Sequence, residues 1–575
     1  MNDLILRQAG FSELACQFAG FIDRINQSND ELIPAIAALL SDAVSQGHVC
    51  LNLTQLTAHT LLKGNNRSQL HARLKASLVV GAAGDYRPLI LTDEGLLYLY
   101  RYWSDEQLVA KAIQQRCQPI AVLKPDVLQQ NFADWQSLND DVDWQKIAVF
   151  MALTRQFCVI SGGPGTGKTT IVLRLLELLY RQDDKLNIAL IAPTGKAAAR
   201  LQQAICDTGQ SRLEAKTVHR LLGITANNDQ GRYTPKNTLA VDVLIVDEAS
   251  MIDISLMAKL LNALPEKTRI IMLGDSQQLA SVESGAVLAN LCDQPPQFSK
   301  EFIISIQQFT GMKLTCSAPS TVLLRDSIVM LKHSYRFDEK SDIGCLAKAV
   351  QSGSLANVYQ VMDLAIRNLW QQQLDATSIQ SHVFNNYKPY FDAVKINANA
   401  QQCLQLFDQY RVLSALKTGP QSVSAVNSLI ERQLQKNGWK TYQDFYNGRP
   451  IMVTQNDYRQ RLFNGDTGIV LVDPQGILRA CFISDQTVRW IDLSRLPAHE
   501  TAFAITIHKS QGSEFDKVTV LLPEEDTALL NRELLYTAIT RAKKQITLLC
   551  SDMMLAKTVQ TQHRRETGLA KLLRV

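Results

Sequence analysis

The sequence has little net charge, no long apolar run and no paired cysteines, and each lack removes a class of protein. Lys and Arg number 59 and Asp and Glu 55, so the formal net charge is only +4 over 575 residues. A field this weak does not attract a polyanion, so any nucleic-acid site must be a local groove. No window approaches the ~18 apolar residues of a membrane-spanning helix. Asp3 stands where a signal peptide would be basic, so we expect a cytoplasmic protein.

The eleven cysteines are scattered, and no two of them form a C-x-x-C pair. An odd, dispersed set is typical of reduced, buried thiols and not of disulfides, a zinc site or an iron–sulfur cluster. The sequence also lacks a D…E-x-K carboxylate pattern in a suitable strand. We therefore do not expect a two-metal nuclease site in this chain.

The length predicts several domains, because single domains usually span ~100 to 200 residues. Residues 1–125 have the apolar spacing of helices, and we predict a mainly helical N-terminal domain there. Its aromatic stretch RPLILTDEGLLYLYRYW is either a partner surface, which would make this a partner-docking domain, or ordinary core.

The rest of the chain alternates short apolar strands with helices, which predicts an α/β fold with parallel sheets covered on both faces. CVIS, NIALIAP, VDVLIVDE and RIIMLGD define a first unit, predicted over 140–330. RVLSAL, AFAITI, KVTVLLP and QITLLC define a second unit over 331–575. Within the second unit, successive short strands and Asn-Gly and Pro-Gln-Gly turns predict a small inserted β-barrel at about 440–498.

GGPGTGKT, at 162–169, matches the phosphate-binding pattern G-x-x-x-x-G-K-[ST] in full. A strand enters this loop and an apolar-periodic helix leaves it. Glycines let successive N–H groups wrap a phosphate at the helix N-terminus. In this arrangement Lys168 reaches the outer phosphates of ATP and Thr169 coordinates Mg²⁺.

Two later strand ends add polar groups at the edge of the sheet where open α/β proteins bind ligands. VDVLIVDE ends in Asp247 and Glu248, which predicts one carboxylate for Mg²⁺ and the next for polarising the attacking water. LGDSQQL brings Asp275 and Gln278 to the same edge, where Gln278 can orient water or sense the γ-phosphate.

The stretch ITIHKSQGSEFD allows two interpretations. His508 and Ser510 could be a base and a nucleophile. However, no G-x-S-x-G elbow accompanies them, and the phosphate-binding loop already accounts for the chemistry. We therefore favour a strand-to-helix junction that holds a polyanion.

Taken together, the motifs resemble those of superfamily 1 helicases, which implies two RecA-like motor domains and an SH3-like form for the inserted barrel. In chain order they are Gln145, GGPGTGKTT, APTGKAA, TVHRLL, VDEASM, GDSQQLASV, HSYRF, ITIHKSQGSEFD and LLYTAITRAKK. The resemblance is strongest to the RecD group, the alpha subunit of exodeoxyribonuclease V, and covers most of residues 142–575. GHVCLNL and the aromatic stretch also look like that subunit. The helix–hairpin–helix repeats of longer stand-alone relatives are not found.

The resemblance implies roles for individual residues. Gln145 would pair with adenine, and Arg336 and Arg541 would act as arginine fingers on the γ-phosphate. The nucleotide-binding set is Gln145, Gly162, Gly163, Pro164, Gly165, Thr166, Gly167, Lys168, Thr169 and Thr170. The residues implied to contact DNA are Lys196, Thr217, His219, Thr506, His508 and Ser510. Those implied to couple the ATP site to the DNA track are Gln511, Gly512 and Glu514.

The implied function is that of an ATP-dependent 5′→3′ DNA helicase, the alpha subunit of a heterotrimer with RecB and RecC that processes double-strand DNA ends for repair. The nuclease would lie in another subunit. Two alternatives stay open: a free-standing helicase of the same family, and a P-loop ATPase subunit that regulates without unwinding.

Overall fold

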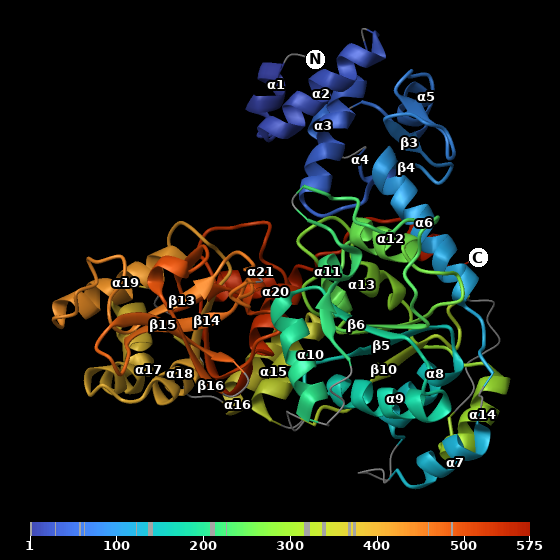
Figure 1. Cartoon of the computed structure of the whole chain (residues 1–575). Helices are drawn as coiled ribbons and strands as arrows, with labels where there is room; N and C mark the ends of the chain where they lie inside the picture. The colour runs from blue at the N-terminus through green and yellow to red at the C-terminus, as the bar shows by residue number, and fades with distance from the viewer. Residues whose placement is uncertain are drawn as a thin grey trace.

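The computed structural model describes the chain except residues 1–2, 29, 57–58, 63, 122–123, 136–141, 208–212, 226, 315–322, 336–340, 366–369, 372–374, 458, 485–486 and 575. Two α/β units lie side by side, and an N-terminal unit sits on the first of them (Figure 1). Among the described helices, none combines the length and apolar character needed to cross a bilayer.

The first α/β unit is built on a parallel sheet, as the strand pattern predicts. Within the described residues its strand order is β10-β5-β9-β8-β6-β7, and every neighbouring pair is parallel. The strands are apolar and buried because helices cover both faces. They are β5 (Phe157–Gly162), β6 (Ile188–Ala192), β7 (Ala215–Thr217), β8 (Val243–Val246), β9 (Arg269–Gly274) and β10 (Ile328–Leu331).

Of the helices of this unit, two precede its first strand, and the others alternate with or follow its strands. They are α7 (Pro125–Ala133), α8 (Trp144–Thr154), α9 (Lys168–Gln182), α10 (Gly195–Asp207), α11 (Val218–Leu222), α12 (Ile254–Asn262), α13 (Val287–Leu291) and α14 (Lys300–Thr310), with the 3₁₀ turn η2 (Ala249–Met251). Polar N-caps mark several helix starts. Asp143, for example, accepts from the backbone N–H of Gln145 and Lys146 and so fixes the start of α8.

The second unit also has a parallel sheet, in the order β11-β20-β19-β12-β18 over the described residues. Its strands are β11 (Trp370–Gln371), β12 (Tyr410–Ser414), β18 (Ala504–Thr506), β19 (Phe515–Leu521) and β20 (Ala542–Leu549). Its helices are α15 (Asp342–Ser352), α16 (Leu355–Ala365), α17 (Ala376–Lys395), α18 (Ala400–Asp408), α19 (Val423–Lys436), α20 (Arg532–Ile539) and α21 (Asp552–Gln560), and η4 (His508–Ser510) follows β18. The prediction of two parallel-sheet units is confirmed.

The predicted β insertion is present as an antiparallel sheet. In the described part its order is β16-β15-β14-β13-β17. The strands are β13 (Arg449–Val453), β14 (Thr467–Val472), β15 (Leu478–Ser484), β16 (Thr487–Ile491) and β17 (His499–Thr501), with η3 (Leu493–Arg495) between the last two. Alternate side chains such as Ile451, Val470 and Phe482 build a small core of its own. Closure into an SH3-like barrel stays a prediction.

The N-terminal unit packs helices against a small mixed sheet of order β1-β4-β3-β2 among its described residues. Its elements are α1 (Asp3–Gln8), α2 (Glu13–Asn26), α3 (Leu32–Ser45), β1 (Cys50–Asn52), α4 (Leu53–Leu56), η1 (Thr60–Leu62), α5 (Arg67–Lys75), β2 (Val80–Gly81), β3 (Leu89–Leu91), β4 (Leu96–Leu99) and α6 (Tyr100–Arg116). Tyr98 is buried, and Tyr102 and Trp103 pack against the core that this unit shares with the first α/β unit. The aromatic stretch therefore serves mainly as core.

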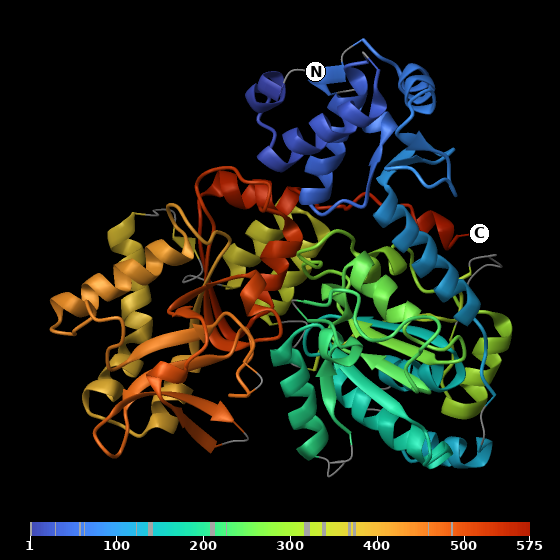
Figure 2. The same cartoon turned by 45° about the horizontal axis from the view of Figure 1, so that its top comes forward.

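The C-terminal segment ties the three units together. After α21 the chain leaves the second unit and runs between the N-terminal unit and the first α/β unit, ending beside α6 in α22 (Leu569–Leu572) (Figure 2). The Arg565 guanidinium donates to the carbonyls of Glu283 at 2.6 Å and Gly285 at 2.7 Å. Gly568 donates its N–H to the buried Glu106 carboxylate at 3.1 Å.

Arg565 is expected to be a large contributor to stability. Arg565→Ala leaves several loop carbonyls without a donor, which costs about 2–4 kcal/mol in total, so the first thermal unfolding midpoint falls. Arg564→Ala is the matched control, because its side chain is 73% exposed and pairs with Asp293 at 2.6 Å, an interaction worth below about 1 kcal/mol. Differential scanning calorimetry measures both, and equal midpoints for the two variants would remove this role.

Candidate functional site

The phosphate-binding loop lies where the sequence predicts it, between β5 and α9. Gly165 and Gly167 adopt φ of 78° and 83°, a left-handed backbone that strains other residues. Lys168 is the first residue of α9, and its Nζ donates to the carbonyls of Gly162 at 2.6 Å and Gly163 at 3.1 Å. The predicted residues 162–170 thus form one continuous strand–loop–helix with the N-terminus of α9 at its mouth.

Gln145 covers this loop from α8. Its Nε2 donates to the carbonyl of Thr166 at 2.9 Å. A Cβ on Gly167 would clash with that same Nε2, and the left-handed backbone of Gly167 also disfavours other residues, so a larger residue there would displace Gln145. The structure therefore places Gln145 beside the loop; its pairing with adenine stays a prediction.

The acidic residues stand at the carboxyl ends of β8 and β9, and β9 lies between β8 and β5 in the sheet. Burial raises the pKa of Asp247 to about 6, the neighbouring Glu248 adds to the shift, and Lys168 opposes it. Burial also raises the pKa of Asp275, and Lys168 again opposes the shift. Gln278 donates its Nε2 to Asp275 at 2.9 Å. Lys168, Asp247, Asp275 and Gln278 therefore share one buried, polar site.

A divalent cation fits this site by its chemistry. In the described residues no group of three or more His, Cys, Asp or Glu side chains gathers as a metal site. A cation shared with nucleotide phosphates needs only a hydroxyl and a carboxylate from the protein. Thr169, at the start of α9, would supply the hydroxyl, and Asp247 would supply the carboxylate. The raised pKa of Asp247 beside Glu248 reports an excess of buried negative charge that a cation would relieve.

The second unit reaches into the site through Tyr536 of α20, which the motif analysis missed. The Tyr536 hydroxyl donates to Asp275 at 3.1 Å, and a Cβ on Gly163 would come 2.9 Å from the same hydroxyl. Tyr536 is only 4% exposed. Its signal was present, because it belongs to the LLYTAITRAKK motif that also holds Arg541.

Of the two predicted arginine fingers, Arg541 lies within the described residues. Arg541 is 5% exposed and donates to the backbone carbonyls of Thr537 at 3.0 Å and Ser513 at 3.2 Å. It lies close enough to Tyr536 to oppose the rise in that residue's pKa. Arg336 lies outside the described residues. A finger role for either residue stays a prediction.

Leu279 joins the two units next to Gln278. Its N–H donates to the Thr537 hydroxyl at 3.0 Å, and its carbonyl accepts from Gln511 Nε2 at 3.1 Å. Its side chain packs in the hydrophobic core of the second unit. Gln511, which the sequence predicts to couple the two sites, is thus in direct contact with the segment that follows Gln278.

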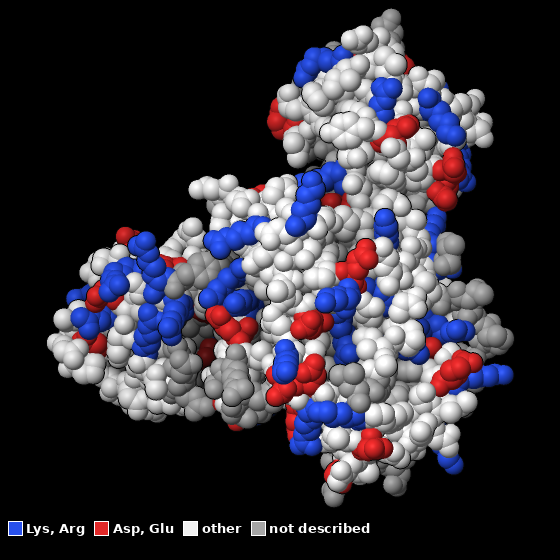
Figure 3. Space-filling view, turned by 45° about the vertical axis from the view of Figure 1, so that its right-hand side comes forward, with Lys and Arg blue, Asp and Glu red and all other residues white. Residues whose placement is uncertain are grey.

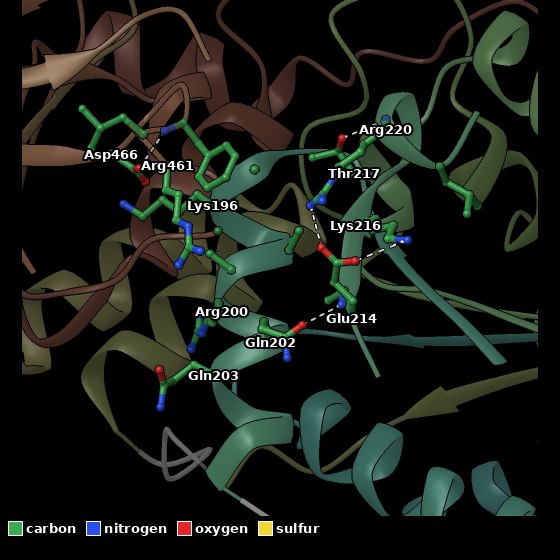
Figure 4. A pocket seen from close by; sticks show the side chains of 18 of the residues that line it. Lys196, Arg200, Gln202, Gln203, Glu214, Lys216, Thr217, Arg220, Arg461 and Asp466 are labelled. Carbon is green, nitrogen blue, oxygen red and sulfur yellow. Dashed lines mark hydrogen bonds and ion pairs between the residues drawn. The ribbon is translucent and has the colours of Figure 1, made fainter. Parts of the chain in front are cut away.

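A groove of about 1680 Å³ lies between the two α/β units and runs along α10. It is lined from the first unit by α10, β7 and α11, and from the second by residues 461–463 and 512–515 among others. Lys196 and Thr217 line it, as do Gly512 and Glu514. Burial lowers the pKa of Lys196, and the nearby carboxylates of Asp408 and Asp466 oppose the shift. Figure 4 shows Lys196 and Asp466 at one side of this groove.

The other residues implied to contact DNA are placed differently. His219 is on α11 in the field of Asp253 and Lys259; it is not among the residues that line the groove, although its neighbour Arg220 is. The Thr506 hydroxyl accepts from the N–H of Lys509 at 3.3 Å, and His508 lies near Arg565. Ser510 is fully buried and donates to the Ile507 carbonyl at 2.6 Å. The structure therefore puts two of these six residues in the groove and turns the Ser510 hydroxyl inward.

Comparison with known proteins gives matches over most of the chain. The RecBCD enzyme subunit RecD N-terminal domain matches residues 7–98, the AAA domain 145–284 and the UvrD-like helicase C-terminal domain 501–549. The RecBCD enzyme subunit RecD of Haemophilus influenzae is 37% identical, over 83% of this chain and 80% of its own length. That of Mycolicibacterium smegmatis is 35% identical, over 95% and 94%. The ATP-dependent RecD2 DNA helicase of Deinococcus radiodurans is 29% identical, over 67% of this chain and 46% of its own length.

The raised pKa of Asp247 predicts opposite effects on stability and on hydrolysis. Because the folded pKa lies above the ordinary 3.8, the ionised carboxylate costs stability above about pH 6, and this cost disappears as the pH falls. Asp247→Asn should therefore raise the thermal midpoint at pH 7.5 in metal-free buffer by roughly 2 °C or more. The same variant should lose nearly all ATP hydrolysis.

At limiting Mg²⁺, lowering the pH should protonate Asp247 and reduce ATP hydrolysis by the unaltered chain, with a midpoint near pH 6. Excess Mg²⁺ should move that midpoint to a lower pH, because the cation competes with the proton. Asp93→Asn is the control, since its side chain is 97% exposed. If the midpoint pH does not change with the Mg²⁺ concentration, Asp247 is not the ligand.

Proposed function

Because this chain belongs to the RecD family of RecBCD enzyme subunits, we propose that it is an ATP-dependent DNA helicase that moves 5′→3′ along a single strand. It works as the alpha subunit of a heterotrimer with RecB and RecC that unwinds and processes double-strand DNA ends for repair. The observation that carries the proposal is one buried site in which the phosphate-binding loop of the first unit meets Tyr536 of the second. A site divided between two units is what a motor requires, because nucleotide can then change how the units are held.

In the proposed reaction, the backbone N–H groups of the loop at 162–170, except at Pro164, which has none, and the Lys168 ammonium hold the phosphates of ATP. Thr169 and Asp247 would hold a divalent cation, for which we propose Mg²⁺, and this cation would offset the phosphate charge. Glu248 orients and polarises the attacking water, and Gln278 senses the γ-phosphate. Arg336 and Arg541 stabilise the charge on the departing phosphate from the second unit.

The proposed movement uses the junction at Leu279. With ATP bound, Tyr536, Thr537 and Gln511 hold the second unit against the first. After hydrolysis this hold weakens, and alternating grip on the strand produces stepping. We propose Lys196 and Thr217 as the contacts on the groove side, with His219, Thr506, His508 and Ser510 recruited in other states of the cycle.

The proposed division of the chain follows the same logic. Residues 1–125 form the unit that docks a partner subunit, 140–330 and 331–575 form RecA-like motor domains, and about 440–498 form the SH3-like insertion. The free-standing alternative has less support, because the RecD2 helicase is 29% identical over 67% of this chain, whereas the RecD of Mycolicibacterium smegmatis is 35% identical over 95%. The nuclease of the complex is proposed to lie in another subunit.

A strand-displacement assay on duplexes with a 5′ or a 3′ single-stranded tail tests this function. The purified chain should unwind the 5′-tailed duplex with ATP, and single-stranded DNA should raise its ATP hydrolysis. Lys168→Gln should lower hydrolysis and unwinding by about 100-fold or more while strand binding persists. Lys185→Gln, an exposed lysine of the same unit, is the control.

Unwinding by Lys168→Gln at the normal rate, in the chain or in the assembled complex, would favour a regulatory subunit. Displacement only of the 3′-tailed duplex would reverse the proposed polarity.

A further inference from the structure

Several cations of the groove are paired with carboxylates or lie near them. Glu214 holds Lys216 at 3.3 Å and Arg220 at 2.8 Å, all within the first unit (Figure 4). Lys196 lies in the field of Asp408 and Asp466. The same mixing of charge extends over the visible face of the molecule, where blue and red side chains are interspersed (Figure 3). A strand phosphate that binds one of these cations must therefore compete with a carboxylate.

One of these pairs connects the two motor units. Arg200 of α10 donates to Glu514 of the second unit at 3.1 Å. Glu514 also pairs with Lys543 of β20 at 3.2 Å, within its own unit. The side chains of Arg200 and Glu514 are 47% and 20% exposed. An ion pair of this exposure is weak, and a phosphate can replace the carboxylate because the guanidinium fork binds both in the same way.

Glu514 stands on a short loop that also contacts the nucleotide side. Gln511, three residues earlier, donates to the Leu279 carbonyl next to Gln278. Ser510 is buried at the start of the loop, and Gly512 turns it with a φ of 73°. A change in what Glu514 holds is therefore transmitted over three residues to the junction beside the ATP site.

We propose that Glu514 occupies the place of a strand phosphate on Arg200. When a phosphodiester of the strand binds the Arg200 guanidinium, the ion pair between Arg200 and Glu514 breaks. Glu514 then remains paired with Lys543. The exchange releases the loop at 511–514 from α10. Arg200 is thus a positioning residue through which an occupied groove acts on Gln511 and the nucleotide site. This inference rests on the proposed function, because it requires a single strand in the groove.

The test is the affinity of the full chain for a fluorescent oligothymidylate, measured by anisotropy without nucleotide. Glu514→Gln removes the competitor and should tighten binding by about two- to fivefold. Arg200→Gln should weaken binding and lower the slope of log affinity against log salt by about 0.7. The double variant should bind like Arg200→Gln, because the carboxylate has no effect once its guanidinium is gone.

Asp392→Asn is the matched control for loss of one negative charge. Asp392 pairs with Lys388 at 2.8 Å on α17, and its side chain is 54% exposed. This variant should leave the affinity unchanged. Glu514→Asp, which keeps the charge but shortens its reach, should also tighten binding and serves if Glu514→Gln does not fold.

Three results overturn the inference while leaving the proposed function intact: Glu514→Gln binds no tighter than the unaltered chain, it tightens binding equally in the Arg200→Gln background, or Asp392→Asn tightens binding as much. If the unaltered chain does not bind oligothymidylate at all, the proposed function fails, and the inference fails with it.

Discussion

The arrangement of the two motor units depends on how one residue, Leu279, is held. Its side chain packs in the core of the second unit, while its N–H and carbonyl bond to Thr537 and Gln511 of that unit. The chain just before it carries Gln278 and Asp275, which belong to the first unit's nucleotide site. Because the side chain, the N–H and the carbonyl of Leu279 all contact the second unit, a movement of that unit should displace the neighbouring Gln278 and Asp275. The junction includes hydrogen bonds that can be exchanged for others when the units shift.

The groove and the nucleotide site lie on opposite sides of this junction. Tyr536 contacts Asp275 on one side, and the Arg200–Glu514 pair faces the groove on the other. The C-terminal segment adds a different kind of connection, because Arg565 and Gly568 attach the end of the second unit to the first unit and to the N-terminal unit. The second unit is therefore attached to the rest of the molecule by the C-terminal segment and by the polar contacts around Leu279, which can be exchanged. That combination suits a motor that changes grip without coming apart.

The sequence was sufficient for features that depend on neighbouring residues. The loop at 162–170, the acidic pair 247–248 and the two parallel sheets follow from local spacing and apolar runs, and the structure has them at the expected positions. It was insufficient where two distant segments meet. Tyr536 and Arg200 each act across the units, and no periodicity marks which side chain crosses a boundary. Ser510 shows a further limit: its motif suggests a phosphate contact, which stays a prediction, but does not indicate that its hydroxyl donates to the Ile507 carbonyl in this structure.

The most direct test of this account is the thermodynamic coupling between nucleotide and strand. The affinity for a non-hydrolysable ATP analogue is measured with and without oligothymidylate, and the strand affinity with and without the analogue. Both ratios must be equal, and a factor of about 5 or more is expected for the unaltered chain. In Leu279→Ala the factor should fall to about 1 while each ligand alone still binds, and Val282→Ala, 79% exposed, should keep it. Full coupling in Leu279→Ala would contradict the claim that the two sites communicate through this junction.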